Sequence, residues 1–396
     1  METKGFTRRD FLIAAGALGA VTSMGGFPAE LFAGGRPLIR YPEKTDLILL
    51  TSRPPQLETP IQYFKELITP NEALFVRWHI SPIPTSVDLA EWRLKVSGNV
   101  EKEMALSLDD LKGFEKVTYV AFIQCSGNGR SFFEPRVPGG QWENGAMGNV
   151  TWSGVRLKDI LSKAGLKAGS VDVSFDGLDS PPLPKVPDFI KSLPVDKALE
   201  DDILIAYEMN GKPLTMLNGF PARLIVPGWF ATYWIKSLSN ITVLAVKFDE
   251  FWMKTAYRIP DTPCACIPPG SKPSKTIPIN RMNTRALIIE PAEGVKPRMN
   301  KPVTISGIAF SGGYSIRDVV VSVDGGKTWH EASLGKDLGR YSWIEWSYKW
   351  KPVKKGKHTL MARATNSIGE SQPFESLWNP AGYMWNKIER KEITVL

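Results

Sequence analysis

The most informative stretch of the chain is residues 117–130, which read VTYVAFIQCSGNGR. Its first six residues are apolar, β-branched or aromatic, and this composition predicts a buried strand. Cys125 follows the strand, and two glycines lie between it and Arg130, which predicts a thiol on a tight turn beside a cation. A neighbouring guanidinium favours the thiolate, the form that attacks electrophiles and binds soft metals. Cys125 is therefore a metal ligand, a nucleophile or simply a packed core residue.

Length and composition are those of a soluble globular protein with more than one domain. The chain has 396 residues, which is enough for two or three domains. Of these residues 43% are hydrophobic and 23% are charged. Its net charge of +8 comes from 49 basic and 41 acidic residues without a long basic run. Dispersed charge indicates solubility or attraction of anions, so we expect no nucleic-acid partner.

Cysteine and histidine are scarce, which argues against several kinds of metal site. Cys264 and Cys266 stand too close together for an easy disulfide and lack a second pair to complete a zinc site, so we expect loop residues at a domain boundary. The sequence has no CxxCH motif, so we expect no attached c-type haem. The three histidines, His79, His330 and His358, are too far apart in sequence to favour a histidine-rich metal cluster.

The N-terminus carries the pattern of an export signal. Residues 7–12 read TRRDFL, a twin-arginine pattern, and the weakly hydrophobic residues 11–21 are too short to span a bilayer. We therefore expect a twin-arginine signal peptide over residues 1–33, a periplasmic mature protein and no membrane span. Twin-arginine export moves folded proteins and commonly follows cofactor insertion, so the signal also favours a bound cofactor.

A second candidate site lies in residues 73–80, which read ALFVRWHI. The run predicts a strand in which Phe75, Arg77 and His79 share one face. Arg77 and His79 together would make a basic pocket suited to an anion. An edge strand with a solvated arginine would show the same pattern, so this alternative stays open.

Two cations and a glycine-rich loop extend the list of candidate binding residues. Arg223 and Lys236 interrupt otherwise apolar strand sequence in residues 201–246, and buried cations need anionic partners, of which phosphate is the obvious one. Residues 135–149 are glycine-rich and aromatic, include Trp142, and show little periodicity. This is the character of a ligand-binding loop on a scaffold.

The domain organisation follows from a change of composition near residue 268. We expect a catalytic domain over residues 34–267 and a linker rich in proline and lysine over residues 268–284. Short alternating strands and turns fill residues 285–396, a pattern that predicts an immunoglobulin-like sandwich.

Several of these features occur together and in order, and together they resemble the sulfite oxidase family of mononuclear molybdenum enzymes. They are Arg77 with His79, Cys125 with Arg130, and the stretches 207–211 and 219–223. The resemblance runs from about residue 70 to the C-terminus. It implies an α+β molybdopterin-binding domain, followed by a sandwich through which the family forms homodimers. Molybdenum and molybdopterin are the implied cofactors, with Cys125 as the metal ligand.

The resemblance also implies roles for individual residues. Arg77, Arg130 and Tyr257 correspond to the pocket that binds the substrate's oxygens, His79 lies among them, and Trp142 lines it. The implied cofactor-binding residues are Phe75, Val76, Arg77, Trp78, His79, Asp179, Asn218, Arg223, Trp234, Ile235 and Lys236. Asn218 stands where the family usually has a histidine, so this chain departs from the pattern there.

Together with the export signal, the resemblance implies an exported sulfite dehydrogenase that oxidises sulfite to sulfate. Because we expect no haem in this chain, the electrons would pass to a separate c-type cytochrome. The alternative within the fold is the sulfane dehydrogenase subunit of a thiosulfate-oxidising complex, and nitrate reduction is a weaker third. From a different class, the protein would be a non-catalytic binding subunit that keeps the fold.

Overall fold

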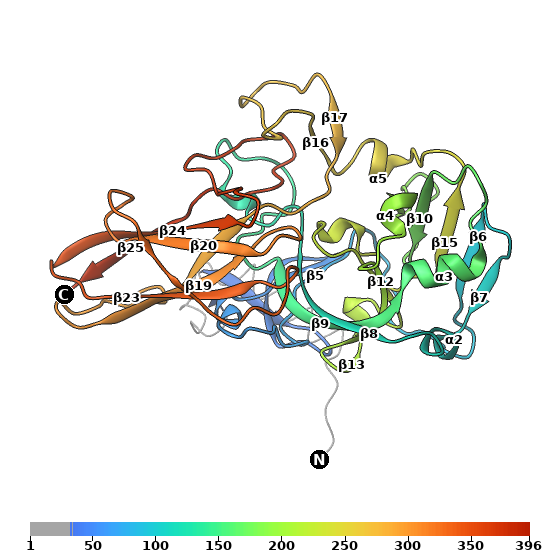
Figure 1. Cartoon of the computed structure of the whole chain (residues 1–396), viewed down its shortest axis with the longest axis horizontal. Helices are drawn as coiled ribbons and strands as arrows, with labels where there is room; N and C mark the ends of the chain where they lie inside the picture. The colour runs from blue at the N-terminus through green and yellow to red at the C-terminus, as the bar shows by residue number, and fades with distance from the viewer. Residues whose placement is uncertain (1–31, 34) are drawn as a thin grey trace, which may run out of the picture.

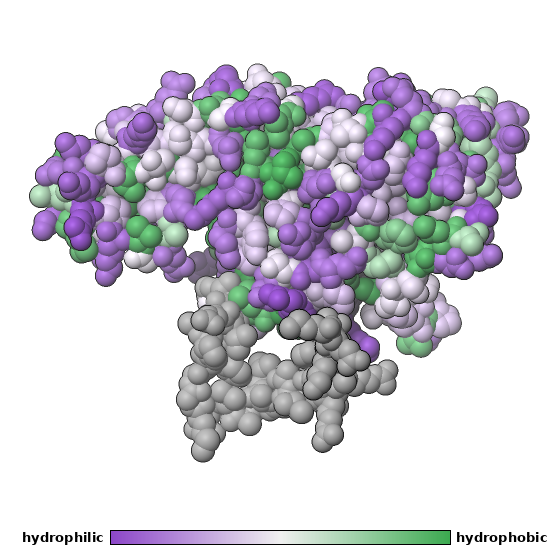
Figure 2. Space-filling model, turned by 90° about the horizontal axis from the view of Figure 1, so that it is seen from below, coloured by the Kyte–Doolittle hydropathy of each residue, from purple (hydrophilic) through white to green (hydrophobic). Residues whose placement is uncertain are grey.

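The computed structural model describes residues 32–33 and 35–396, in which β-sheet dominates (Figure 1). The predicted signal peptide lies almost wholly outside the described residues. Among the described residues, no helix is both long and apolar enough to cross a membrane. Figure 2 shows a face on which hydrophilic residues surround small hydrophobic patches.

An antiparallel sheet of five strands, in chain order, begins the described chain. Its members are β1 (Phe32–Ala33), β2 (Arg36–Arg40), β3 (Asp46–Ser52), β4 (Pro55–Glu58) and β5 (Val76–Arg77). The strand predicted over residues 73–80 is thus reduced to β5, because only Val76 and Arg77 pair with β4. The 3-10 helix η3 (Ile61–Lys65) precedes it.

The second sheet is mixed, with β15 and β6 running parallel. Its order is β11 (Lys191–Pro194), β10 (Asp172–Asp176), β15 (Asn240–Leu244), β6 (Leu94–Gly98) and β7 (Met104–Leu106). The chain around it forms α2 (Leu108–Lys112), α3 (Leu157–Ala164), α4 (Val195–Ala198) and α5 (Phe251–Lys254). Ser107 and Asp110 exchange side-chain and backbone hydrogen bonds as a capping box at the start of α2.

The third sheet positions the cysteine. Its order is β13 (Lys212–Pro213), β12 (Leu204–Met209), β9 (Met147–Arg156) and β8 (Val117–Gln124), with β14 (Arg223–Ile225) also paired to β12. All residues of β8 pair with β9, which confirms the strand predicted before Cys125. Three short 3-10 helices contribute residues to the cavities beside Cys125, which follows β8. They are η4 (Arg130–Phe132), η5 (Met216–Asn218) and η6 (Ala231–Tyr233).

Two four-stranded sheets pack around a shared core in the C-terminal part of the chain. One contains β18 (Arg285–Glu290), β19 (Val303–Phe310), β23 (Ile344–Trp350) and β22 (Ser333–Leu334). The other contains β21 (His330–Glu331), β20 (Ile316–Ser322), β24 (Gly356–Asn366) and β25 (Arg390–Val395). The immunoglobulin-like label stays a prediction.

The core of the catalytic part extends into the C-terminal part. Phe310 of the C-terminal part packs against Phe122, with ring centroids 4.7 Å apart, and Trp343 packs edge-on against Phe64, with centroids 5.2 Å apart. A hairpin of β16 (Arg258–Pro260) and β17 (Thr276–Pro278) begins in the catalytic part and ends inside the predicted linker. The connection between β24 and β25 then returns to the loop after Cys125, where the Met384 amide donates to the Ser126 carbonyl. The C-terminal part therefore takes part in building the site.

Candidate active site

Cys125 lies where two cavities meet. The inner cavity has about 420 Å³ of empty space, in part open to solvent, and is lined by Phe75, Arg77, His79, Cys125, Ser126, Leu217, Asn218, Arg223, Ala231, Thr232, Lys236 and Tyr257. The outer cavity has about 710 Å³ of empty space, also in part open to solvent, and is lined by Gln56, Arg77, Cys125, Gly127, Arg130, Pro138, Gly139, Gly140, Trp142, Trp252, Ala256, Tyr257, Pro380, Ala381 and Tyr383. Cys125, Arg77 and Tyr257 line both, so a group held in one cavity would meet a ligand in the other at this cysteine.

The turn after Cys125 is packed tightly against Arg130. A Cβ atom at Gly127 would lie 2.6 Å from Arg130 Nη1, and one at Gly139 would lie 2.9 Å from it. These glycines therefore leave the space that the guanidinium fills. Arg130 Nε donates to the Ala381 carbonyl at 3.2 Å, and Nη1 donates to the Gly140 carbonyl at 3.1 Å. Arg130 thus braces the walls of the outer cavity and also faces it.

Arg77 makes fewer side-chain hydrogen bonds than Arg130. It is half-buried on β5, and Nη1 donates to the Trp78 carbonyl at 2.6 Å. Because no other side-chain hydrogen bond joins it to the described residues, most of its donors remain available to a ligand. Arg77 and Arg130 together give the outer cavity two cations that can bind an oxyanion.

His79 contacts Tyr257 rather than acting as a second cation. The His79 Nε2 and Tyr257 Oη atoms are 2.5 Å apart, and the imidazole stacks on Phe189. Burial lowers the pKa of His79 well below its ordinary value, and the charges of Arg77 and Lys236 lower it further. The lowered pKa of His79 favours the neutral imidazole, so Arg77 supplies the positive charge that this pair brings to the cavity. Burial raises the pKa of Tyr257, which keeps its hydroxyl protonated.

The inner cavity is walled by buried cations with too little negative charge to balance them. Burial lowers the pKa of Lys236 to about 7 and that of Arg223 to about 9. Lys44 lies behind this wall, and burial lowers its pKa to about 7. Asp179 is the neighbouring carboxylate that opposes the shift at Lys236, yet burial raises its own pKa to about 6. Both members of this pair are shifted toward neutrality, so the wall would gain from a buried anion.

Four buried polar atoms of the inner cavity have no hydrogen-bond partner among the described residues. They are Arg223 Nε, Thr232 Oγ1, Ser126 Oγ and His79 Nδ1. Buried polar groups are almost always paired, so orphans that line one cavity indicate a polar ligand. The phosphate and the heterocycle of molybdopterin fit both the cations and these orphans, and Cys125 supplies a soft ligand for its metal.

The structure separates the predicted cofactor-binding residues into two groups. Six of them line the inner cavity, namely Phe75, Arg77, His79, Asn218, Arg223 and Lys236. Val76 and Trp78 instead pack in a small separate core, Trp234 packs edge-to-face against Trp152, and the Ile235 carbonyl accepts from the Leu224 amide. Asp179 acts on the site through its charge, which raises the pKa of Lys236. Trp142 lines the outer cavity as predicted. The individual binding roles stay predictions.

Asn218 joins two walls of the inner cavity. Its Oδ1 accepts from Lys44 Nζ and from Thr215 Oγ1, and its Nδ2 donates to the Phe75 carbonyl at 3.3 Å. Lys44 also donates to the Asn71 and Leu74 carbonyls, at 2.7 and 3.0 Å. The Lys44 and Asn218 side chains therefore fix the backbone at Leu74 and Phe75, the second of which lines the inner cavity.

Sequence reasoning missed several residues of the site. Lys44 lies in an irregular segment without any motif, and Gln56 lies on β4 directly opposite Arg77. Tyr383 comes from the connection between β24 and β25, and its ring stacks on Tyr257 with centroids 5.5 Å apart. One signal was present for Tyr383, because this connection covers residues 367–389 and loops of that length are usually functional.

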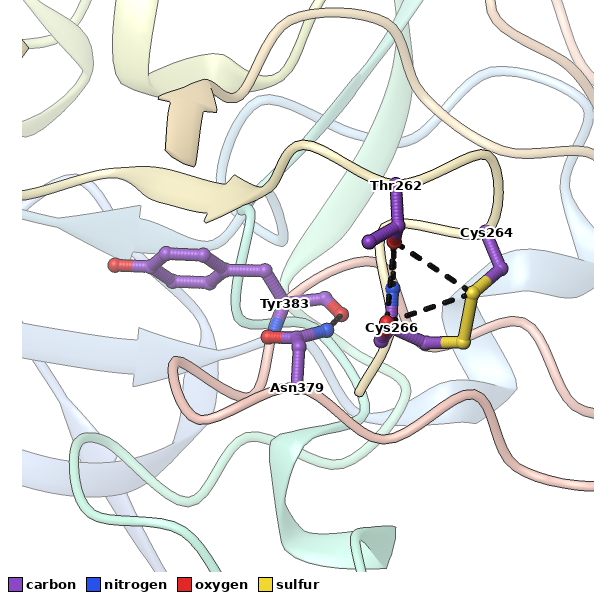
Figure 3. Close-up of a disulfide and its surroundings, with 5 residues drawn as sticks. All are labelled: Thr262, Cys264, Cys266, Asn379 and Tyr383. Carbon is purple, nitrogen blue, oxygen red and sulfur yellow. Dashed lines mark hydrogen bonds between the residues drawn. A yellow bond between two sulfur atoms is a disulfide. The ribbon is translucent and has the colours of Figure 1, made fainter. Parts of the chain in front are cut away.

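Cys264 and Cys266 lie on a loop, as expected, but they form a disulfide, so the expectation that they stand too close together for an easy one is wrong (Figure 3). The reason is the backbone of the residue between them. Ala265 has a φ of 50°, and this left-handed conformation accompanies a Cα separation of 5.1 Å, within the range that a disulfide spans. Cys125 is the free cysteine.

Comparison with known proteins supports a molybdopterin site in this chain. Residues 80–252 match the oxidoreductase molybdopterin binding domain, and residues 276–395 match the Mo-co oxidoreductase dimerisation domain. The mitochondrial sulfite oxidase of Drosophila melanogaster is 32% identical over 91% of this chain and 66% of its own length. That of Homo sapiens is 33% identical over 90% of this chain and 67% of its own length. The chain thus spans about two thirds of these relatives.

A solved structure supports the same fold. The sulfane dehydrogenase SoxCD from Paracoccus pantotrophus superposes with a TM-score of 0.75 over 95% of this chain and 96% of that chain, at 24% identity. A likeness at this identity concerns the fold alone. Together with the family models and the sulfite oxidases, it leads to one conclusion. The chain belongs to the sulfite oxidase family of molybdenum enzymes, and its cofactor is molybdenum bound by molybdopterin.

Proposed function

We propose that the chain is an exported sulfite dehydrogenase that oxidises sulfite to sulfate and passes the electrons to a separate c-type cytochrome. The observation that carries the proposal is that Cys125, Arg77 and Tyr257 line both cavities. Molybdopterin in the inner cavity, with its metal on Cys125, would face an oxyanion held in the outer cavity. The relatedness to sulfite oxidases supports sulfite as that oxyanion.

The residues of the outer cavity bind and orient the substrate. Arg77 and Arg130 would donate charge-assisted hydrogen bonds to sulfite oxygens, which turns the sulfur lone pair toward Cys125. When bound, the molybdenum cofactor supplies the two-electron redox chemistry. Trp142 and Trp252 line the same cavity and exclude water from its walls.

Tyr257 and His79 are suited to managing protons. Sulfite and water give sulfate, two electrons and two protons, so two protons must leave the site. In the tautomer in which His79 Nε2 carries the proton, it donates to Tyr257 Oη, and the Tyr257 hydroxyl can donate to a substrate oxygen. In the other tautomer the Tyr257 hydroxyl donates to His79 Nε2, and the imidazole can accept that proton as Tyr257 takes up one from the substrate site. Because the pKa of His79 is lowered, it would not retain that proton at neutral pH.

Two further features support parts of the proposal. The twin-arginine pattern of residues 7–12 supports export, and a disulfide such as Cys264–Cys266 forms in oxidising compartments such as the periplasm. The match of residues 276–395 to a dimerisation domain supports a homodimer. The absence of a CxxCH motif from the sequence supports a cytochrome on another chain as the electron acceptor.

The second candidate is the sulfane dehydrogenase subunit of a thiosulfate-oxidising complex. The outer cavity favours it in one respect, because its space of about 710 Å³ is in part open to solvent and leaves room beyond a four-atom anion. A sulfur atom carried on an arm of another protein would use that room. The assembled cysteine, arginines and tyrosine disfavour the non-catalytic binding subunit.

A turnover assay tests the proposal. The purified molybdenum-loaded protein should reduce ferricytochrome c when sulfite is added, with two cytochromes reduced per sulfate formed. The same chain from a host that cannot make molybdopterin serves as the control and should be inactive. Absence of turnover with sulfite would exclude the first candidate, and turnover with a protein-bound persulfide alone would favour the second.

The buried lysines predict a pH dependence for the chain without its cofactor. Burial lowers the folded-state pKa of Lys44, Lys191 and Lys236 to about 7, whereas an unfolded lysine has a pKa near 10.4. Between these pKa values the unfolded chain binds more protons, so stability should rise with pH. Asp176 and Asp179 have raised pKa values of about 7 and 6. These carboxyl groups bind more protons in the folded chain, so they oppose the rise of stability with pH mainly below pH 7.

Melting temperatures measured from pH 7 to pH 9 check this prediction. The cofactor-free chain should melt at progressively higher temperature across this range. The loaded chain should rise less, because the phosphate anion stabilises the charged lysines. Lys236→Met should reduce the rise in the cofactor-free chain, and equal slopes for the loaded and cofactor-free forms would contradict an anion beside Lys236.

A further inference from the structure

The Cys264–Cys266 disulfide lies on the loop between β16 and β17, outside both cavities. Cys264 is exposed and Cys266 is half-buried. Figure 3 shows the disulfide in the surroundings of Asn379 and Tyr383, with the Tyr383 ring directed away from it. Nothing in the proposed reaction uses this pair of cysteines.

A structural role explains the disulfide poorly. A cross-link stabilises a fold chiefly in proportion to the loop it closes, and this one encloses a single residue. The ends of the loop are already joined, because Pro260 pairs with Thr276 in the hairpin. The Asp261 amide donates to the Lys275 carbonyl at 3.0 Å, and the two side chains form an ion pair at 2.6 Å. The loop would therefore stay closed without the disulfide.

The residue between the cysteines is held in an unfavourable conformation. Ala265 has a φ of 50°, a region that costs an alanine free energy because its Cβ approaches the backbone. Its amide donates to the Thr262 carbonyl at 2.9 Å, and the Thr262 hydroxyl donates to the Cys266 carbonyl at 3.1 Å. The Thr262 hydroxyl is also 3.7 Å from Cys264 Sγ, where it can stabilise a sulfur anion. Cleavage would let Ala265 relax.

The loop is connected to one wall of the outer cavity. The Ile267 amide donates to the Trp378 carbonyl at 2.9 Å, and Trp378 Nε1 donates to the Pro135 carbonyl at 2.9 Å. Trp378 begins a segment, residues 378–383, that we name the lip, and Pro380, Ala381 and Tyr383 of this segment line the outer cavity. A change in the loop is therefore transmitted to the lip by a backbone hydrogen bond.

We propose that Cys264–Cys266 is a thiol-exchange site for an external dithiol, and that its redox state controls how firmly the lip is held. One thiolate of the dithiol attacks the exposed Cys264 Sγ, the bond to Cys266 breaks, and Cys266 leaves as a thiolate. The second thiolate of the reagent then displaces Cys264. The dithiol is oxidised to a disulfide, and the two cysteines gain two electrons and two protons.

The proposal is independent of the substrate and is tested on the loaded, folded protein. Dithiothreitol is added without denaturant, new thiols are alkylated with a maleimide, and peptides are identified by mass spectrometry. Cys264 and Cys266 should be labelled while Cys125 is protected, with an unchanged circular dichroism spectrum. Amide hydrogen exchange of peptides covering residues 374–388 should become faster. Labelling only after denaturation, or unchanged exchange in the reduced protein, would overturn the proposal.

Two variants make the test independent of the reagent. Cys264→Ser/Cys266→Ser should show the fast lip exchange without any reductant, and slow exchange equal to that of the oxidised protein would contradict control of the lip. Ala265→Gly keeps both cysteines and removes the backbone penalty from the oxidised form. It should lower the equilibrium constant for reduction by dithiothreitol on the order of tenfold. An unchanged equilibrium constant would show that the backbone conformation of Ala265 does not favour reduction of the disulfide.

Discussion

Replacing Cys125 with serine should abolish sulfite-dependent turnover while leaving the fold intact. A serine hydroxyl is a harder ligand than a thiolate and far more difficult to deprotonate, so it suits molybdenum poorly. The loss should exceed about 100-fold, because even supporting partners of metal ligands are typically worth 10 to 100-fold. The fold should persist, because the Cys125 amide donates to the Ala146 carbonyl and its carbonyl accepts from Asn128, and both are backbone interactions.

The measurement is the rate of cytochrome c reduction with saturating sulfite, together with molybdenum and pterin content. The wild-type chain without cofactor gives the inactive baseline, and circular dichroism reports the fold of each sample. If Cys125→Ser retained wild-type turnover at wild-type molybdenum content, the cysteine would not be the ligand. The position of Cys125 between the two cavities would then need another explanation.

Replacing Arg77 with glutamine should raise the KM for sulfite by about 10 to 100-fold, because a hydrogen bond to a charged group is worth about 1.5–3 kcal/mol. The melting temperature should change little, because Arg77 makes a single hydrogen bond, to the Trp78 carbonyl. Arg130→Gln should differ. Arg130 bonds to the Ala381 and Gly140 carbonyls, so its loss should lower the melting temperature as well as sulfite binding.

Steady-state kinetics over a range of sulfite concentrations and differential scanning fluorimetry separate these two effects. Arg40→Gln is the matched control, because Arg40 is exposed on β2 and pairs with Asp46. It should leave KM unchanged. A normal KM in Arg77→Gln would remove this arginine from the substrate pocket, and a normal melting temperature in Arg130→Gln would contradict its bracing role.

The parts of the site that local sequence determines could be predicted. The strand before Cys125 was predictable because β-branched and aromatic residues fill it, and the start of α2 because Ser107 and Asp110 form a capping box. Arg77 and His79 do line one cavity, but they do not reach it from one face of a single strand, as predicted. Only Val76 and Arg77 pair as a strand, and His79 reaches the cavity on irregular chain beyond it.

The rest of the site depends on long-range packing. Lys44 reaches Asn218 from 174 positions away, and Tyr383 reaches Tyr257 from the other part of the chain. No local pattern records such contacts. Residue type gives only the ordinary pKa of His79, whereas burial and the neighbouring cations lower it in the folded chain. The disulfide was missed because sequence spacing does not reveal the φ of Ala265.

The connection between β24 and β25 has a consequence for folding. It carries Pro380, Ala381 and Tyr383, which line the outer cavity together with residues of the catalytic part. The catalytic part alone would therefore leave this cavity open on the side of Tyr383. Folding of the catalytic part and closure of its outer cavity are thus separate steps, and the second step requires the C-terminal part to dock.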